Sequence, residues 1–78
     1  MELFNEITNV FRKVFQNPNL ELTFHTSSKE IENWDSLHHM ELINELENHF
    51  KININFQESM KINTVNEIYE LVKNKKGN

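Results

Sequence analysis

The amino-acid sequence predicts a small all-α domain. Three stretches, residues 2–16, 36–50 and 64–75, repeat apolar side chains every three or four positions. That spacing places the apolar side chains on one face of a helix, where they can pack against a core. The chain has 78 residues, which predicts a single domain over residues 1–78. It contains no cysteine, so disulfides and zinc sites built on thiolates are excluded.

The first helical stretch covers residues 2–16. Its apolar side chains are Leu3, Phe4, Ile7, Val10, Phe11, Val14 and Phe15. Asn17 and Pro18 follow this stretch, and the residue before a proline avoids the helical backbone region. We therefore expect the helix to end there.

Residues 17–35 are expected to form a long loop. The segment Leu20–Phe24 alternates apolar and polar residues, a pattern that also fits a short strand. Ser27 and Glu30 have the spacing of a capping box for one short helical turn. Loops longer than about 12–15 residues are uncommon and usually functional, so this loop points to a site.

The second helix has the clearest pattern in the chain. Its apolar stripe consists of Leu37, Met40, Ile43, Leu46 and Phe50. Asp35 and Ser36 precede the stripe, and both residue types are good helix N-caps. The last helix begins with Thr64 and Glu67, which have the spacing of a capping box.

Residues 51–63 are ambiguous. The segment Ile52–Phe56 alternates like a strand, whereas Phe56 and Met60 are four apart, as in one helical turn. Pairing this segment with Leu20–Phe24 would give three helices and a two-stranded ribbon. An isolated two-stranded unit is marginal in water, so this architecture ranks second to a purely helical one.

The charge distribution argues against nucleic acid as a partner. The chain has a net charge of −4, with 12 acidic residues against 8 Lys and Arg, and phosphate binding requires a basic face. Between Glu30 and Phe50 there is no Lys or Arg, and the acids are Glu30, Glu32, Asp35, Glu41, Glu45 and Glu47. This stretch predicts an acidic surface that attracts basic partners. On charge alone, however, a helix face that is merely solvated is the better interpretation.

The sequence contains no sign of membrane insertion. No run of about 18 apolar residues is present. Glu2 and Glu6 lie where a signal peptide would have a basic and then an apolar segment. We therefore expect a cytoplasmic protein.

The segment Trp34-Asp35-Ser36-Leu37 is the strongest candidate for a functional site. Ser36 lies in the first turn of a strong helix, after a long loop. A helix N-terminus offers unpaired amide groups and a positive dipole end, which suit a phosphate group. Taken in isolation, however, Asp35 and Ser36 are explained far better as helix caps.

The wider pattern resembles the acyl carrier protein family. The matching residues are Asp35-Ser36-Leu37, Glu41-Leu42, Leu46-Glu47, Phe50, Ile54, Ile62 and Thr64-Val65. The resemblance extends over nearly the whole chain. It implies a four-helix bundle with a long first loop and a short third helix at residues 56–61.

The resemblance also implies how the protein works. Ser36 would receive 4′-phosphopantetheine from coenzyme A through a separate phosphopantetheinyl transferase that uses magnesium. Asp35 and Leu37 would assist at this site. A docking surface for basic patches on acyl-loading and acyl-using enzymes would comprise Met40, Glu41, Glu45 and Glu47. The chain itself would catalyse no reaction, hold no metal, bind no nucleic acid or membrane, and act as a monomer in transient complexes.

Three positions differ from the pattern of fatty-acid carriers. His38 and His39 stand where an acidic residue usually follows the Asp-Ser-Leu, and Trp34 replaces a small residue. These differences leave open an aminoacyl or hydroxyacyl carrier of a specialised pathway. An unmodified acidic helical interaction domain also remains open. We interpret both histidines as exposed helix residues without a role.

Two catalytic or metal-binding alternatives are disfavoured. Asp35, Ser36 and His38 are too close in sequence to form the linear relay of a hydrolase triad. His38 and His49 share a helix face but are separated by about 16 Å of helical rise, too far to ligate one ion.

Overall fold

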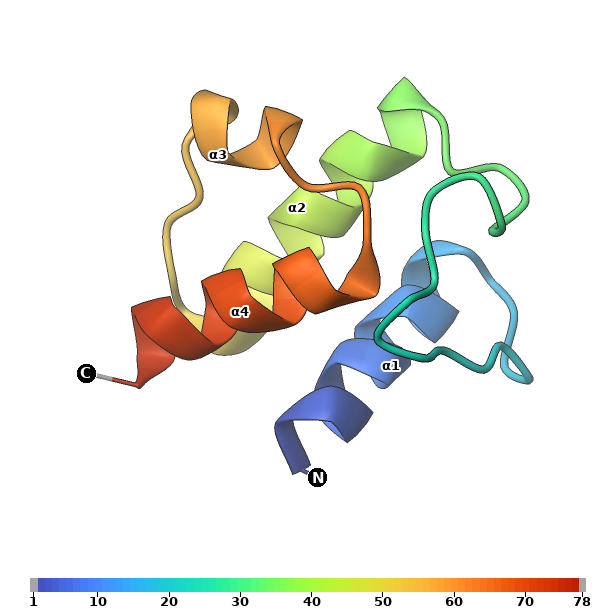
Figure 1. Ribbon diagram of the computed structural model, residues 1–78, viewed down its shortest axis with the longest axis horizontal. Coiled ribbons are helices and arrows are strands. Elements are labelled where there is room, and N and C mark those ends of the chain that lie inside the picture. The colour runs from blue at the N-terminus through green and yellow to red at the C-terminus, as the bar shows by residue number, and fades with distance from the viewer. Residues whose placement is uncertain (1, 78) are drawn as a thin grey trace.

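Four α-helices in chain order make up the fold. The structure is a computed structural model, and it describes residues 2–77. The helices are α1 (Glu2–Val14), α2 (Ser36–Phe50), α3 (Phe56–Met60) and α4 (Val65–Lys76) (Figure 1). Within residues 2–77 the extended structure is limited to an isolated bridge between Ser27 and Thr64. The predicted all-α four-helix bundle is confirmed, and the alternative with a two-stranded ribbon is wrong.

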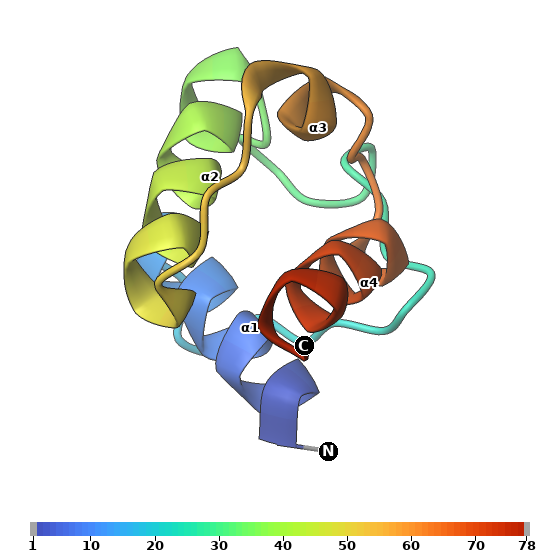
Figure 2. The same cartoon turned by 90° about the vertical axis from the view of Figure 1, so that its left-hand side faces the viewer.

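The three longer helices surround the core, and the short helix covers one side of it. In Figure 2, α3 lies between α2 and α4 on the side opposite α1. Seven large side chains in the centre are fully buried, namely Ile7, Phe11, Leu42, Leu46, Val65, Ile68 and Val72. They come from α1, α2 and α4, so these three helices depend on one another for burial. None of the helices in the described part of the chain has the length and apolar character that a membrane crossing requires.

Helix α1 ends two residues earlier than the sequence predicted. Gln16 adopts a left-handed backbone conformation with φ 54°, which turns the chain away from the helix axis. The Nε of Arg12 donates a hydrogen bond to the backbone oxygen of Leu20 at 2.8 Å. This contact holds the start of the first loop against α1.

The first loop is attached to the start of α4 rather than paired as a strand. The backbone N–H groups of Val65 and Asn66 donate to the oxygens of Thr26 and Phe24, at 2.9 and 3.0 Å. The first N–H groups of a helix have no partner within the helix, so the loop supplies their acceptors. Leu22 in this segment is buried, which explains the apolar alternation without a strand.

The short turn predicted at Ser27 and Glu30 is present, although no α-helix begins there. The backbone N–H of Glu30 donates to the oxygen of Ser27 at 3.0 Å and closes a turn. The capping box of Thr64 and Glu67 at the start of α4 is confirmed. A further capping box, formed by Asn55 and Glu58, begins α3 and adds to those predicted from the sequence.

Residues 51–55 connect α2 to α3 without forming a strand. Ile54 points into the core and is buried, whereas Phe56 is exposed. The backbone N–H of Ile54 donates to the carboxylate of Glu47 at 2.8 Å. The Glu47 side chain of α2 therefore accepts the backbone hydrogen bond that a neighbouring strand would accept in a sheet.

Truncation of the core is expected to destabilise the protein far more than truncation of the surface. Leu46 is 0% exposed and Leu37 on the same helix is 65% exposed. Leu46→Ala should lower the free energy of unfolding by about 2–5 kcal/mol, because it removes buried methyl groups and leaves a cavity. The matched variant Leu37→Ala should change it by less than about 0.5 kcal/mol. Urea unfolding followed by circular dichroism measures both, and equal losses would contradict the assigned core.

Candidate functional site

The candidate site lies where the first loop meets α2. Asp35 is the N-cap of this helix, and its carboxylate accepts a hydrogen bond from the backbone N–H of His38 at 2.9 Å. Ser36 is the first helical residue and is exposed. Within residues 2–77 its hydroxyl group has no hydrogen-bond partner. The structure therefore decides between the two predicted caps: Asp35 caps the helix, and the Ser36 hydroxyl remains available for chemistry.

A negative charge is fixed beside Ser36. Two groups of His38 donate to the Asp35 carboxylate, the backbone N–H and the ring Nδ1–H, each at 2.9 Å. These hydrogen bonds, the backbone one first, hold the pKa of the Asp35 carboxyl below its ordinary value. The ring of His38 also stacks on Phe15, with 5.7 Å between the centroids. His38 therefore has a local role in the site, which corrects the interpretation of this residue as one without a role.

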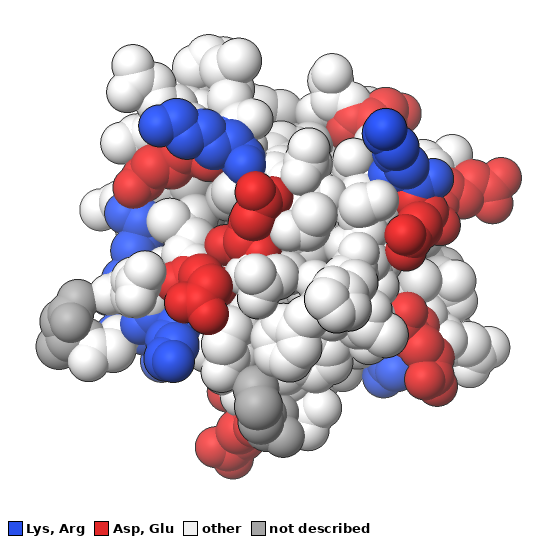
Figure 3. Space-filling model, in the orientation of Figure 1, with Lys and Arg blue, Asp and Glu red and all other residues white. Residues whose placement is uncertain are grey.

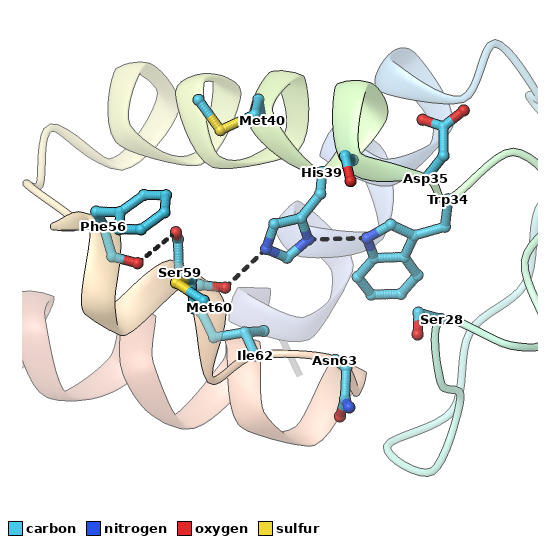
Figure 4. A pocket seen from close by; sticks show the side chains of 11 residues that line it. Ser28, Trp34, Asp35, His39, Met40, Phe56, Ser59, Met60, Ile62 and Asn63 are labelled. Carbon is cyan, nitrogen blue, oxygen red and sulfur yellow. Dashed lines mark hydrogen bonds between the residues drawn. The ribbon is translucent and has the colours of Figure 1, made fainter.

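A cleft of about 510 Å³ opens next to Ser36, between the first loop, α2, α3 and the connection from α3 to α4 (Figure 4). Its lining consists of Ser28, Trp34, Asp35, Ser36, His39, Met40, Phe56, Ser59, Met60, Ile62 and Asn63. From the sequence alone, either an acyl pocket between the helices or an ordinary core could contain Met40, Ile43, Leu46, Ile54, Ile62, Ile68 and Leu71. Met40 and Ile62 do line the cleft, whereas the other five do not. The opening therefore lies outside the packed core rather than within it.

The mouth of the cleft is apolar. The large exposed hydrophobic side chains of the described residues are Leu37, Met40, Phe56 and Met60. Three of them line the cleft, and Leu37 follows Ser36 directly. Phe56 and Met60 were not predicted as site residues, because their four-residue spacing indicated only one helical turn. The Asn55–Glu58 capping box fixes where α3 begins and could have indicated its position.

His39 connects α2 to two other parts of the chain. The Nε1–H of Trp34 donates to its Nδ1 at 2.9 Å, and its Nε2–H donates to the backbone oxygen of Ser59 at 2.7 Å (Figure 4). The imidazole is half-buried. The expectation that His39 is an exposed residue without a role is therefore wrong. No local sequence signal could have found this contact, because Ser59 is 20 residues away.

The predicted docking residues differ in how freely they face solvent. Met40 and Glu41 are exposed. Glu45 pairs with Lys13 at 3.2 Å, and Glu47 accepts the backbone N–H of Ile54 at 2.8 Å. Of the three glutamates, Glu41 is thus the one whose carboxylate has no partner within residues 2–77.

Acidic and basic side chains are interspersed on the face shown in Figure 3. No group of three His, Asp or Glu side chains within residues 2–77 is placed to hold a metal ion.

A family model and a solved structure match this chain. Residues 5–72 match the family model described as the phosphopantetheine attachment site. The chain is also similar to the holo acyl carrier protein of Geobacter metallireducens, whose structure was solved in solution by NMR. The two are 40% identical with a TM-score of 0.87, over 96% of this chain and 86% of that one. No curated protein matches the chain.

The Asp35 cap is expected to make stability depend on pH. Because the pKa of Asp35 is lowered in the folded protein, its contribution is present above the ordinary carboxyl range, about pH 4, and is lost as the pH falls through the folded pKa. Asp35→Asn keeps a cap acceptor but cannot ionise. Wild type should therefore be the more stable at pH 7, and the difference should close towards pH 3. Urea unfolding across this range measures it.

The control for this prediction is Glu32→Gln, an exposed carboxylate of the same loop that caps no helix. The difference in unfolding free energy between Glu32→Gln and wild type should not show the pH dependence expected for Asp35→Asn. A difference between wild type and Asp35→Asn that stays constant from pH 7 to pH 3 would refute the role of the ionised cap.

Proposed function

Since the chain belongs to the acyl carrier protein family, with a phosphopantetheine attachment domain, we propose that it carries its cargo on Ser36. Its covalent cofactor is 4′-phosphopantetheine. When attached, the cofactor supplies the thiol that this cysteine-free chain lacks, and the cargo is held on it as a thioester. The family consists of carriers rather than catalysts, so the chain is assigned no reaction of its own.

The observation that carries the proposal is the state of the Ser36 hydroxyl. It is exposed, makes no hydrogen bond within residues 2–77, and lies at the N-terminus of a 15-residue helix. In the transfer, Ser36 Oγ forms a bond to the phosphorus next to the pantetheine of coenzyme A. The pyrophosphate bond breaks, 3′,5′-adenosine diphosphate leaves, and the hydroxyl proton is lost. The positive end of α2 favours the phosphodiester that results.

The neighbours of Ser36 have supporting roles in this proposal. The ionised Asp35 carboxylate is positioned to face the magnesium of the transferase. Leu37 and Met40 provide exposed apolar contacts beside the serine. Glu41 is the leading electrostatic contact for a basic partner, with Glu45 and Glu47 extending the surface. Delivery of cargo to partner enzymes, in transient complexes of a monomer in the cytoplasm, completes the proposal for this single domain of residues 1–78.

Incubation with coenzyme A, magnesium and a broad-specificity phosphopantetheinyl transferase is expected to add one phosphopantetheine to the wild type. Intact-protein mass measures the addition. Ser36→Ala should gain nothing, because the acceptor oxygen is absent. The matched control Ser28→Ala alters another serine of the same cleft and should be modified like the wild type. Failure of the wild type with several transferases would favour an unmodified helical interaction domain.

Charge reversal at Glu41 is expected to slow the transferase reaction. Glu41→Lys should reduce kcat/KM by about three- to tenfold at low salt, and the defect should shrink at high salt, since rim charges act mainly on association. The matched control is Glu70→Lys, an exposed glutamate on α4. Equal effects of the two substitutions would show that total charge, rather than a docking surface on α2, controls the rate.

A further inference from the structure

The wall of the cleft beside Ser36 contains a histidine whose protonation state is defined by its partners. The indole N–H of Trp34 can only donate, and the backbone oxygen of Ser59 can only accept. His39 lies between them, at 2.9 Å from the indole nitrogen and 2.7 Å from the oxygen. Both hydrogen bonds form together only when Nδ1 is bare and Nε2 carries the hydrogen. The two partners and distances therefore fit the Nε2–H tautomer of His39.

Protonation would affect the two hydrogen bonds in opposite ways. A hydrogen on Nδ1 of His39 would face the indole hydrogen of Trp34, so two donors would meet and the bond would be lost. The bond from Nε2–H to the Ser59 oxygen would persist and gain the strength of a charged donor. The link between α2 and α3 would stay in place, while the link between α2 and the first loop would open.

No charged group compensates for this change. Asp35, the other ionisable residue among the described residues lining the cleft, already accepts two hydrogen bonds from His38. On α3, Glu58 pairs with Lys75 of α4 at 3.1 Å. Lys61, which follows α3, carries a positive charge and cannot accept a hydrogen. Within residues 2–77, no carboxylate bonds to the His39 ring.

Release of Trp34 would remain local. The indole also packs edge-on against Phe11 of α1 at 5.4 Å between centroids, and is tilted against Phe15, just after α1, at 6.0 Å. These aromatic contacts do not titrate, so they retain the indole against the core when its hydrogen bond to His39 opens. Figure 4 shows Trp34 and Ser28 at the same end of the cleft, whereas Met60 lies towards α3.

We propose that His39 is a proton-operated latch on the Trp34 wall of the cleft. The neutral imidazole holds the indole in place, and protonation releases it and widens the cleft at the end next to Ser36. This inference rests on the proposed function in one respect: the group admitted by the wider cleft is the arm on Ser36 together with its cargo.

The unmodified protein provides the test, because Trp34 is the single tryptophan. The shift of its indole N–H proton in NMR spectra, and its fluorescence, would be followed between about pH 5 and 8, where histidine side chains titrate. Wild type should show one transition in both signals. His39→Gln should abolish it, since an amide offers a donor and an acceptor at every pH. The neighbouring His38→Gln should retain it. The latch is overturned if wild type shows no transition or if the transition survives His39→Gln. It is also overturned if the transition disappears only in His38→Gln.

A second reading of the same titration tests the widening. The NMR chemical shift of the Ser28 backbone amide should change with pH in parallel with that of Trp34. The chemical shift of the Met60 methyl group should change by only a small fraction of that amount. Equal shifts would indicate general loosening, and no shift at Ser28 would indicate release without widening; either result overturns the widening. The titration uses no coenzyme A, so a negative result there does not bear on the attachment of phosphopantetheine to Ser36. A negative result in the attachment experiment likewise does not bear on the latch.

Discussion

The site depends on the attachment of the first loop to the start of α4. A long loop has many backbone polar groups that need partners, and the first turn of a helix has N–H groups that need acceptors. In this protein the loop and the helix start supply each other's hydrogen-bond partners. Val65 and Asn66 donate to the loop, and Ser28 donates to the oxygen of Asn63 at 2.9 Å. Once the loop is held there, its last residues reach α2 in a fixed position.

From that fixed position a short series of contacts leads to Ser36. Trp34 fills the space between α1 and α2 through its aromatic contacts with Phe11 and Phe15. Asp35 then begins the helix as its cap. Because the cap is made by the residue before Ser36, the serine hydroxyl is not required for helix initiation. The same backbone arrangement thus stabilises α2 and leaves its first side chain in solvent.

Local signals in the sequence predicted much of this structure. The bounds of α2 and the start of α4 at Thr64 follow from caps and from helical periodicity, which act over a few residues. The choice of the Asp35-Ser36 segment as a site rested instead on the resemblance to the acyl carrier protein family. The sequence could not reveal contacts between distant residues. The bond from His39 to Ser59 and the use of Glu47 by Ile54 depend on tertiary packing. The alternation at Leu20–Phe24 was misleading because one buried side chain, Leu22, anchors a loop as well as a strand.

The proposed choice of Ser36 among the serines of the cleft rests on the same physical factors. Ser59 also lines the cleft, but it is buried and its hydroxyl donates to the backbone oxygen of Phe56 at 2.8 Å. Ser28 lies in the loop, without the dipole of a helix behind it. Ser36 alone of the cleft's three serines combines exposure, a helix N-terminus and an adjacent ionised carboxylate. In the proposed function, an enzyme that approached this face with a pyrophosphate-bound arm would meet one exposed hydroxyl at the positive end of a helix, which favours a phosphodiester.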